Sequence, residues 1–487
     1  MRILKWLLAS LVLLYLVLLI PESSNKIPAE KARTPFVWKQ DQYWQALEQK
    51  YAEARNAGCS MLAPRIDSSL TELAAKVDSL ELAAYGAPDS IYDRIEQTMF
   101  ELGPEIGACR EKLTAYGTLF NRLRSNLKRQ SANWDLTDQQ ARVRLYRLLY
   151  GGRTAIEQIM LQLPEDSVAG MTMAEDVASA TPSTMVLGVT IHSGDILVSR
   201  GGAPTSALIA RGNDFPGNFS HIALAYVDSA SGQASIVESH IERGVVISSL
   251  DEYLGDTKLR VMVLRVRPDL AAIVADPMVP HKAARYAVDR VRAGHVPYDF
   301  QMDYDDPSQL FCSEVASDGY RAVGMKLWMG MSHISSPGIR SWLGAFGVTH
   351  FETQEPSDLE YDPQLKVVAE WRSPKTLAKD QIDNAATDQM LEDADRGLEL
   401  SYDWFLLPVA RVLKAYSVGL NWIDRIGPVP EGMSATGALR NEWYSAKHAE
   451  LTSRIAVEAD RFRKEKGYVA PYWELVSIAK RADSLLN

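Results

Sequence analysis

Cys312 and His221 are the two residues of this chain whose types and surroundings best suit nucleophilic chemistry. Cys312 follows a polar, turn-rich run and opens a helix-like stretch from Phe311 to Val323. The positive end of a helix stabilises the thiolate, which is the nucleophilic form of cysteine. His221 begins an apolar run, 221–227, that is typical of a buried strand. We therefore expect a Cys/His pair for acyl transfer, with the sulfur and a ring nitrogen roughly 3–4.5 Å apart.

Two residues compete to be the third member of this site. A turn at Ser229–Gly232 would join two antiparallel strands, so that Glu238, at the end of the second strand, could lie opposite His221. A carboxylate in that place would orient the imidazole, as in a nucleophile, base and acceptor triad. His240 shares a face of the strand with Glu238 and is the alternate third member. Each residue alone is more often structural, and the prediction depends on their joint arrangement.

Metal chemistry has weaker support in the sequence. An acidic stretch that contains Cys312 suggests a calcium loop, but its spacing lacks the central glycine of an EF-hand. A turn in which aspartates cap the backbone explains this run better. No Cys/His cluster has the spacing of zinc ligands. We expect no metal and no cofactor. The acidic residues of the run are Asp299, Asp303, Asp305, Asp306 and Glu314.

Five short motifs resemble those of the permuted papain-like amidases of the YiiX/YebB-like branch. This branch belongs to the NlpC-type superfamily, which also includes lecithin–retinol acyltransferase-like proteins. The histidine precedes the cysteine in this branch, which reverses the papain order. The resemblance covers residues 185–350, under half of the chain. The motifs are Gly194-Asp195-Ile196-Leu197, Phe219-Ser220-His221-Ile222-Ala223, Val237-Glu238, Pro297-Tyr298-Asp299-Phe300 and Leu310-Phe311-Cys312-Ser313-Glu314.

The resemblance implies a role for each matching residue. Cys312 would be the nucleophile, His221 the general base and then the general acid, and Glu238 the third member. Tyr298 would line the site near the oxyanion, and Ser313 is a second candidate for that position. The implied fold is an α+β permuted papain-like domain, in which an antiparallel sheet packs on helices and all-α regions flank it.

The pattern along the chain divides it into six segments. Apolar residues recur at a spacing of three to four in the first third and again after Pro374, which predicts helices. Short β-branched runs between them predict strands. The expected segments are 1–21, a signal anchor or signal peptide; 22–36, a tether; 37–163, a helical bundle or hairpin; 164–187, a linker; 188–372, the hydrolase domain; and 373–487, a helical region.

The N-terminus and the composition bound the location. Arg2 and Lys5 precede an almost unbroken apolar run, Trp6 to Ile20, without a small-residue cleavage site after it. This pattern favours an uncleaved membrane anchor that leaves the rest on the extracytoplasmic, periplasmic side; a cleaved signal and a soluble secreted protein are the alternative. The net charge of −10 argues against nucleic-acid binding. Of the three cysteines, Cys59 and Cys109 could be buried hydrophobes or a disulfide.

Two functions follow from these patterns. The first is a cysteine hydrolase that cleaves an amide, peptide or acyl bond through a thioester, on a peptide, amide or lipid-linked substrate of the cell envelope. The second is a membrane-anchored scaffold with a vestigial papain-like core, whose helical regions bind a protein partner. The intact Cys/His/Glu set favours the hydrolase.

Overall fold

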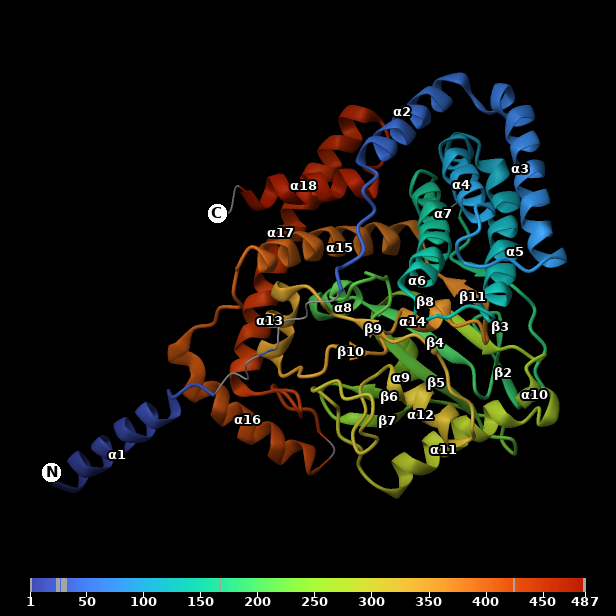
Figure 1. The fold of residues 1–487 in the computed structure, drawn as a ribbon. Helices are drawn as coiled ribbons and strands as arrows, with labels where there is room; N and C mark the ends of the chain where they lie inside the picture. The colour runs from blue at the N-terminus through green and yellow to red at the C-terminus, as the bar shows by residue number, and fades with distance from the viewer. Residues whose placement is uncertain (1, 23–26, 28–32, 166–167, 424, 485–487) are drawn as a thin grey trace.

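A seven-stranded antiparallel sheet organises the middle of the chain (Figure 1). It is seen in a computed structural model that describes residues 1–487 except 1, 23–26, 28–32, 166–167, 424 and 485–487. The strands follow the order β1-β11-β8-β4-β5-β6-β7. They span β1 (Met171–Met173), β4 (Ile196–Gly201), β5 (His221–Val227), β6 (Ala234–His240), β7 (Gly244–Ser249), β8 (Lys258–Val266) and β11 (Leu365–Trp371).

Alternating side chains give this sheet two buried faces. Ile222 and Leu224 of β5 share a core with α11 (Val279–Ala293) and α12 (Glu314–Ala322), which cover one face. Ala223 and Ala225 point the other way. They pack in a core with the hairpin of β2 (Ser183–Val186) and β3 (Val189–His192) and with Tyr253 of α9 (Leu250–Gly255). The expected α+β fold with an antiparallel sheet packed on helices is confirmed.

Helices precede the sheet and extend its core. The apolar face that α11 and α12 cover is continuous with the interior of the N-terminal helices, since Leu73, Phe120 and Leu149 belong to the same buried cluster as Leu224. A π-helical turn, Tyr146–Tyr150, links α6 to α7. The helices are α2 (Asp41–Ala57), α3 (Cys59–Leu82), α4 (Ile91–Ala108), α5 (Leu113–Ser131), α6 (Gln139–Leu145) and α7 (Gly151–Leu161).

Helices also follow the sheet, and α15 joins them to the rest. It lies between α7, α8 and β8 on one side and α17 and α18 on the other, as Figure 1 shows. Most of its residues are therefore buried, including the polar ones. The remaining elements are α8 (Pro204–Arg211), α10 (Ala271–Ala275), β9 (Ser332–His333), α13 (Pro337–Phe346), β10 (Glu352–Thr353), α14 (Asp358–Tyr361), α15 (Pro374–Asp395), α16 (Leu407–Asn421), α17 (Ala435–Lys466) and α18 (Tyr472–Ser484).

A buried network of ion pairs ties the helical regions to the sheet. Arg153 of α7 holds Glu360 through two hydrogen bonds of 2.6 and 2.9 Å and also pairs with Glu157 at 3.0 Å. Arg260 of β8 contacts both Glu157 and Asp380 of α15 at 2.6 Å. Burial alone would raise the pKa of Glu157, but Arg260 and Arg153 lower it to about 2. This network of ion pairs therefore links the N-terminal helices, the sheet and α15.

Replacing Glu157 with Ala is expected to destabilise the whole protein. The change leaves Arg153 with Glu360 alone and Arg260 with Asp380 alone, and removal of one partner from such a buried network costs up to about 3–5 kcal/mol. Urea unfolding would measure the loss. Glu450→Ala is the matched control, because Glu450 is exposed and pairs only with Arg454 one turn away; about 0.5 kcal/mol is expected there. Equal effects of the two changes would contradict the proposed coupling.

The region before the sheet differs from the sequence prediction in one respect. Segment 164–187, expected to be a linker, contributes β1 to the edge of the sheet and β2 to a hairpin. These strands have three and four residues, too few for a periodic pattern to stand out. Most of the expected tether lies outside the described residues, at 23–26 and 28–32.

The N-terminal segment forms helix α1 (Arg2–Leu18), which projects from the body (Figure 1). No helix among the described residues combines the length and apolar character needed to cross a membrane. The expected transmembrane anchor is therefore not supported. The described helix has 17 residues, whereas a span needs about 20.

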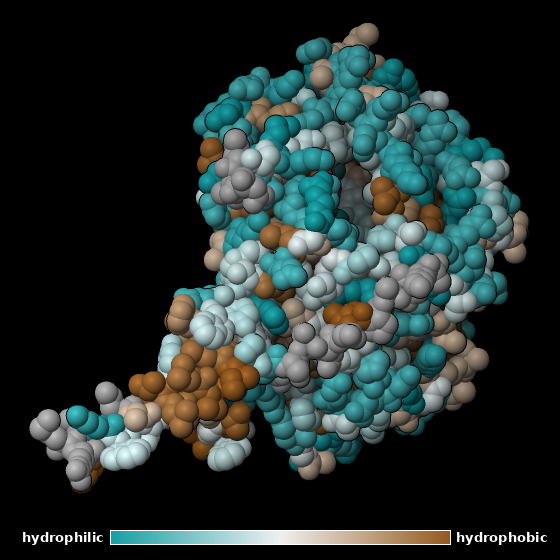
Figure 2. All heavy atoms as spheres, turned by 60° about the vertical axis from the view of Figure 1, so that its left-hand side comes forward, coloured by the Kyte–Doolittle hydropathy of each residue, from teal (hydrophilic) through white to brown (hydrophobic). Residues whose placement is uncertain are grey.

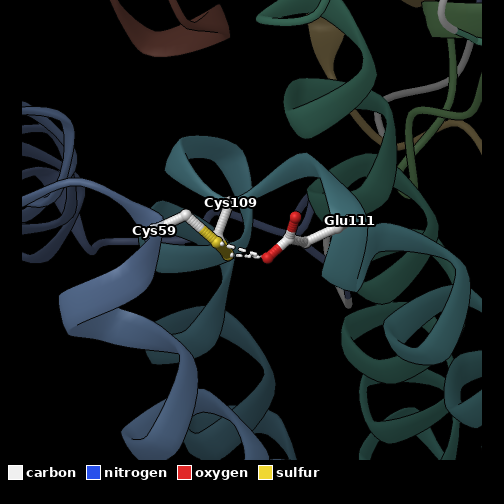
Figure 3. Close-up of side chains that lie close together, drawn as sticks. All are labelled: Cys59, Cys109 and Glu111. Carbon is white, nitrogen blue, oxygen red and sulfur yellow. Dashed lines mark hydrogen bonds between the residues drawn. A yellow bond between two sulfur atoms is a disulfide. The ribbon is translucent and has the colours of Figure 1, made fainter.

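Cys59 and Cys109 form a disulfide, one of the two outcomes that the sequence left open (Figure 3). It joins the start of α3 to the end of α4, 50 residues apart in sequence. The carboxylate of Glu111 lies beside it, with Oε1 2.9 Å from Cys59 Sγ. Sulfurs that are bonded to each other are poor metal ligands, since the thiolate is the form that binds metal. This cluster therefore has a structural role.

Candidate active site

Helix α12 brings Cys312 to the sheet. Ser313 is its N-cap residue, so Cys312 lies at the positive end of the helix. Gly319 lets the helix approach closely, because an added Cβ there would lie 2.9 Å from the Ala283 carbonyl oxygen of α11. The buried carboxyl of Glu314 accepts the Phe311 N–H at 3.0 Å and fixes the chain entering the helix. Packing, rather than the cysteine itself, therefore sets the position of the thiol.

Cys312 is a buried free thiol. It lies beside the residue that precedes strand β5. Its sulfur donates to the Ser220 carbonyl oxygen at 3.7 Å and lies 4.0 Å from Ser313 Oγ. The next residue, His221, interacts with the thiol through its side chain. The nucleophile and base expected from the sequence are thus neighbours in the structure.

Glu238 of β6 holds the other side of the His221 ring. Its Oε2 lies 2.8 Å from His221 Nε2, which leaves Nδ1 for the sulfur. The strand register pairs Glu238 with Ala223. Glu238 is therefore a diagonal neighbour of His221 on the same face, rather than the directly opposite residue that the hairpin pattern suggested.

The second carboxylate oxygen of Glu238 is also occupied. Ser248 of β7 donates to Oε1 at 2.6 Å. His240 Nε2 lies 3.2 Å from the same oxygen, and the His240 and His221 rings are 6.0 Å apart between centroids. His240, the alternate third member, therefore contacts one oxygen of the carboxylate while His221 contacts the other. The sequence analysis did not find Ser248. Nothing in the sequence marks a serine of β7 as a partner of a carboxylate on the neighbouring strand β6.

The contacts of this trio shift the ionisation of its members. Burial lowers the pKa of His221, but the contacts with Cys312 and Glu238 outweigh it and raise the pKa to about 9. Burial by itself would raise the pKa of Glu238. Its contacts with His221 and His240 outweigh burial and bring this pKa well below its usual range. At neutral pH the geometry therefore favours an imidazolium that stands between a carboxylate and the sulfur.

The imidazolium depends on the sulfur, which gives a prediction. In Cys312→Ala the pKa of His221 is expected to fall from about 9, because the largest raising contact is removed while the lowering effect of burial stays. NMR titration of the ring, assigned by comparison with His221→Asn, would measure it. Glu242→Gln, a change at a partly buried carboxylate near His240, is the control. A His221 pKa that stays near 9 without the thiol would contradict the assigned contact.

Further groups lie near Cys312. Tyr298 is half-buried, and burial and the nearby Cys312 raise the pKa of its hydroxyl well above the usual value, so it stays a neutral donor. Ser313 is fully buried. Glu355 was missed by the sequence analysis, since it lies in a short loop without a pattern. Burial, Asp358 and Cys312 raise its pKa well above the usual range, which favours the protonated carboxyl.

The acidic run before Cys312 forms capped turns. Asp299 is fully buried and accepts the backbone N–H groups of Gln301 and Asp303 at 2.7 and 2.6 Å. Asp306 accepts from Ser308 in the same way at 2.9 Å. These carboxylates are used by the backbone, as the turn interpretation expects, and the turns carry the chain from Tyr298 to the nucleophile.

Comparison with known proteins agrees with this geometry. Residues 190–369 match the family model described as permuted papain-like amidase enzyme, YaeF/YiiX, C92 family. No curated protein matches the chain. Among solved structures, one described as metalloprotein YiiX from Escherichia coli O157:H7 matches with 19% identity and a TM-score of 0.29, covering 36% of this chain and 95% of that one. Residues 190–369 thus form a YiiX-like permuted papain-like amidase domain, and the protein is a cysteine amidase- or peptidase-like enzyme.

Proposed function

We propose that the protein hydrolyses an amide, peptide or acyl bond of a cell-envelope substrate through a thioester on Cys312. The observation that carries this proposal is the continuous contact from Cys312 through His221 to Glu238. A thiol at a helix N-terminus, a base and an orienting carboxylate are the parts that covalent acyl transfer needs.

The reaction divides into two halves. In the first, His221 holds the proton of the Cys312 thiol, and the sulfur attacks the substrate carbonyl carbon. The tetrahedral intermediate collapses to a thioester as His221 gives that proton to the leaving amine or alcohol. In the second half, His221 takes a proton from water, the hydroxide attacks the thioester, and the thiol is regenerated with release of a carboxylic acid. In this proposal the neutral Tyr298 hydroxyl donates to the oxyanion.

Alkylation by iodoacetamide at pH 6 tests the activation of the thiol. The proposal predicts selective reaction at Cys312, since Cys59 and Cys109 are joined in a disulfide. The His221→Asn variant should react much more slowly. Cys312 that is inert, or that reacts equally in both proteins, would favour the alternative of a scaffold with a vestigial papain-like core.

We further propose that the enzyme works at a membrane surface. Six consecutive residues of α1, Leu11, Val12, Leu13, Leu14, Tyr15 and Leu16, are all exposed by two-fifths or more. Consecutive helical residues point in all directions, so this helix is apolar on every side, which suits lipid better than water. The disulfide adds support, because disulfides persist in oxidising, extracytoplasmic compartments.

A second element continues the apolar surface of α1. Exposed Val409, Val412, Leu413 and Tyr416 form a stripe along α16. Figure 2 shows apolar residues gathered at the base of the projecting helix. Arg411 of α16 donates to the Leu18 and Ile20 carbonyls at 3.0 and 2.6 Å, which fixes the two elements together. We name the exposed faces of α1 and α16 the apolar tip.

The apolar tip connects to the active-site segment. Lys414 of α16 donates to the Pro430 carbonyl oxygen at 2.9 Å. The neighbouring Glu431 pairs with His295 at 2.6 Å, three residues before Tyr298. A bilayer under the tip would thus place the site near the surface, which suits a lipid-linked or wall-linked substrate.

Flotation with vesicles of phosphatidylethanolamine and phosphatidylglycerol tests the membrane proposal. The full chain is expected to float, and Val412→Asp to lower the bound fraction at least about tenfold, since it removes apolar burial worth about 1.5 kcal/mol or more. Val457→Asp is the matched control, because Val412 and Val457 are both 61% exposed but Val457 lies on α17. A chain that stays at the bottom of the gradient would contradict the proposal.

A further inference from the structure

A cavity lies away from the active site. It has a volume of about 840 Å³ and is lined by residues of α2, α4, α7, α15 and α18, helices that Figure 1 labels. Cys312, His221 and Glu238 are not among its lining residues. Its volume is in the range of sites that hold small organic ligands. The mechanism above makes no use of it.

Aromatic rings form the walls of this cavity. The half-buried indoles of Trp44 on α2 and Trp473 on α18 stack with centroids 5.8 Å apart, and Trp38 packs edge-on against Trp44 at 5.7 Å. Glu48 fixes the Trp473 ring by accepting its N–H at 2.9 Å. Tyr146 and Tyr150 also line the cavity and stack with centroids 4.6 Å apart. The walls are thus rigid, flat and apolar, with faces suited to ring-shaped ligands.

Side-chain amides line the floor. Gln381 and Asn384 lie one turn apart on α15 and are 4% and 1% exposed. The side-chain oxygens of both, and of Gln158 on α7, have no hydrogen-bond partner among the described residues. Buried acceptors without partners cost stability. A ligand with hydrogen-bond donors would satisfy them, whereas an alkyl chain would not.

The rim carries mostly negative charge. Asp41, Glu392, Asp395 and Glu474 lie there against Lys39 and Lys480. Arg211 in the interior is neutralised by Asp388 through two contacts of 2.7 and 2.8 Å. A phosphorylated or carboxylated ligand would therefore meet net repulsion at the rim and a guanidinium that is already paired inside. These charges disfavour an anionic ligand.

We propose that this cavity binds an uncharged oligosaccharide. The C–H faces of sugar rings pack on indole and phenol rings, and sugar hydroxyls donate to amide oxygens while they accept from other groups. Flat aromatic walls, unpartnered amide oxygens and an acidic rim together fit this chemistry. The site is separate from the amidase centre, and the proposal does not depend on the proposed function.

Calorimetric titration of the full chain with cellotetraose, maltotetraose and chitotetraose tests the site, with anionic tetragalacturonate as the charge control. At least one neutral tetrasaccharide is expected to bind, and tetragalacturonate is not. Trp44→Ala and Gln158→Leu should each weaken binding about tenfold or more. Gln158 is half-buried, so its near-isosteric replacement is expected to leave the fold intact even if Trp44→Ala does not.

Two controls distinguish binding in this cavity from binding elsewhere on the protein. Tyr286→Ala removes an exposed ring on α11, outside the cavity, and should leave saccharide affinity unchanged. Cys312→Ala should also bind normally, so that failure of the amidase proposal and failure of this one are distinguishable. The inference is overturned if no neutral tetrasaccharide binds at millimolar concentration, if tetragalacturonate binds equally well, or if Gln158→Leu leaves the affinity unchanged.

Discussion

Replacing His221 with Asn is expected to lower acyl transfer by roughly 10³-fold or more. The change removes the group that takes the thiol proton and returns it to the leaving group. It also removes the cation beside the sulfur, because His221 is the residue whose pKa is raised to about 9 by its contacts with Cys312 and Glu238. Hydrolysis of p-nitrophenyl acetate, an activated acyl donor, would measure kcat/KM without knowledge of the natural substrate.

The matched control for this change is another histidine, on a hairpin beside the same sheet. His192 Nδ1–H donates to the Thr181 carbonyl oxygen, 3.0 Å away, and His192 lies on β3 outside the site. His192→Asn is expected to keep kcat/KM within about twofold, since it touches none of the reacting groups. Wild-type rates in His221→Asn would remove the residue from the mechanism.

The protonation states of His221 and Glu238 also predict how kcat/KM of the wild-type protein depends on pH. His221 must be protonated to donate to the leaving group, so kcat/KM should fall as pH rises through about 9. On the acid side, Glu238 stays ionised because its pKa is held well below the usual range. Protonation of Glu238 therefore limits the rate only at strongly acidic pH.

Replacing Glu238 with Gln is expected to lower kcat/KM by roughly 10²–10⁴-fold while the fold is kept. Gln is nearly isosteric and can retain the contact with Ser248. It cannot stabilise an imidazolium, and it can present an N–H to His221 Nε2 and so favour the wrong tautomer. The p-nitrophenyl acetate assay and a circular dichroism melt, run together, separate lost chemistry from lost folding.

Two neighbouring changes sharpen the Glu238 prediction. Glu242→Gln, at a partly buried carboxylate 4.0 Å from His240, should have a much smaller effect than Glu238→Gln. His240→Ala should lower kcat/KM only modestly, because His240 touches the carboxylate and not the nucleophile. Full activity in Glu238→Gln together with loss in His240→Ala would make His240 the third member instead.

The sequence predicted the parts of the fold that have strong local patterns. The runs that became β5, β6, β8 and β11 are rich in β-branched residues and bounded by turns, so their strands and the hairpin that brings His221 near Glu238 followed from pattern alone. The helix after Cys312 did so as well. In each of these elements the apolar side chains follow a regular spacing that is visible within about ten residues.

The parts that the sequence did not predict depend on contacts between distant residues. Glu157, Arg260 and Asp380 come from three separate regions, and nothing in their local sequence shows that they share one buried network. Ser248 and Glu355 reach the site through strand register and loop packing. The diagonal placement of Glu238 depends on a register that turn residues at 229–232 did not fix. Long-range packing decides each of these.

A covalent intermediate on Cys312 tests the central claim most directly. The protein would be mixed with p-nitrophenyl acetate, quenched in acid and mapped by mass spectrometry. The mechanism predicts an acetyl group on Cys312 that hydroxylamine removes, that accumulates more slowly in His221→Asn and that is absent from Cys312→Ala, which should show no hydrolysis above background. Hydrolysis that persists in Cys312→Ala, with Cys312 unmodified in the active wild-type protein, would contradict the mechanism.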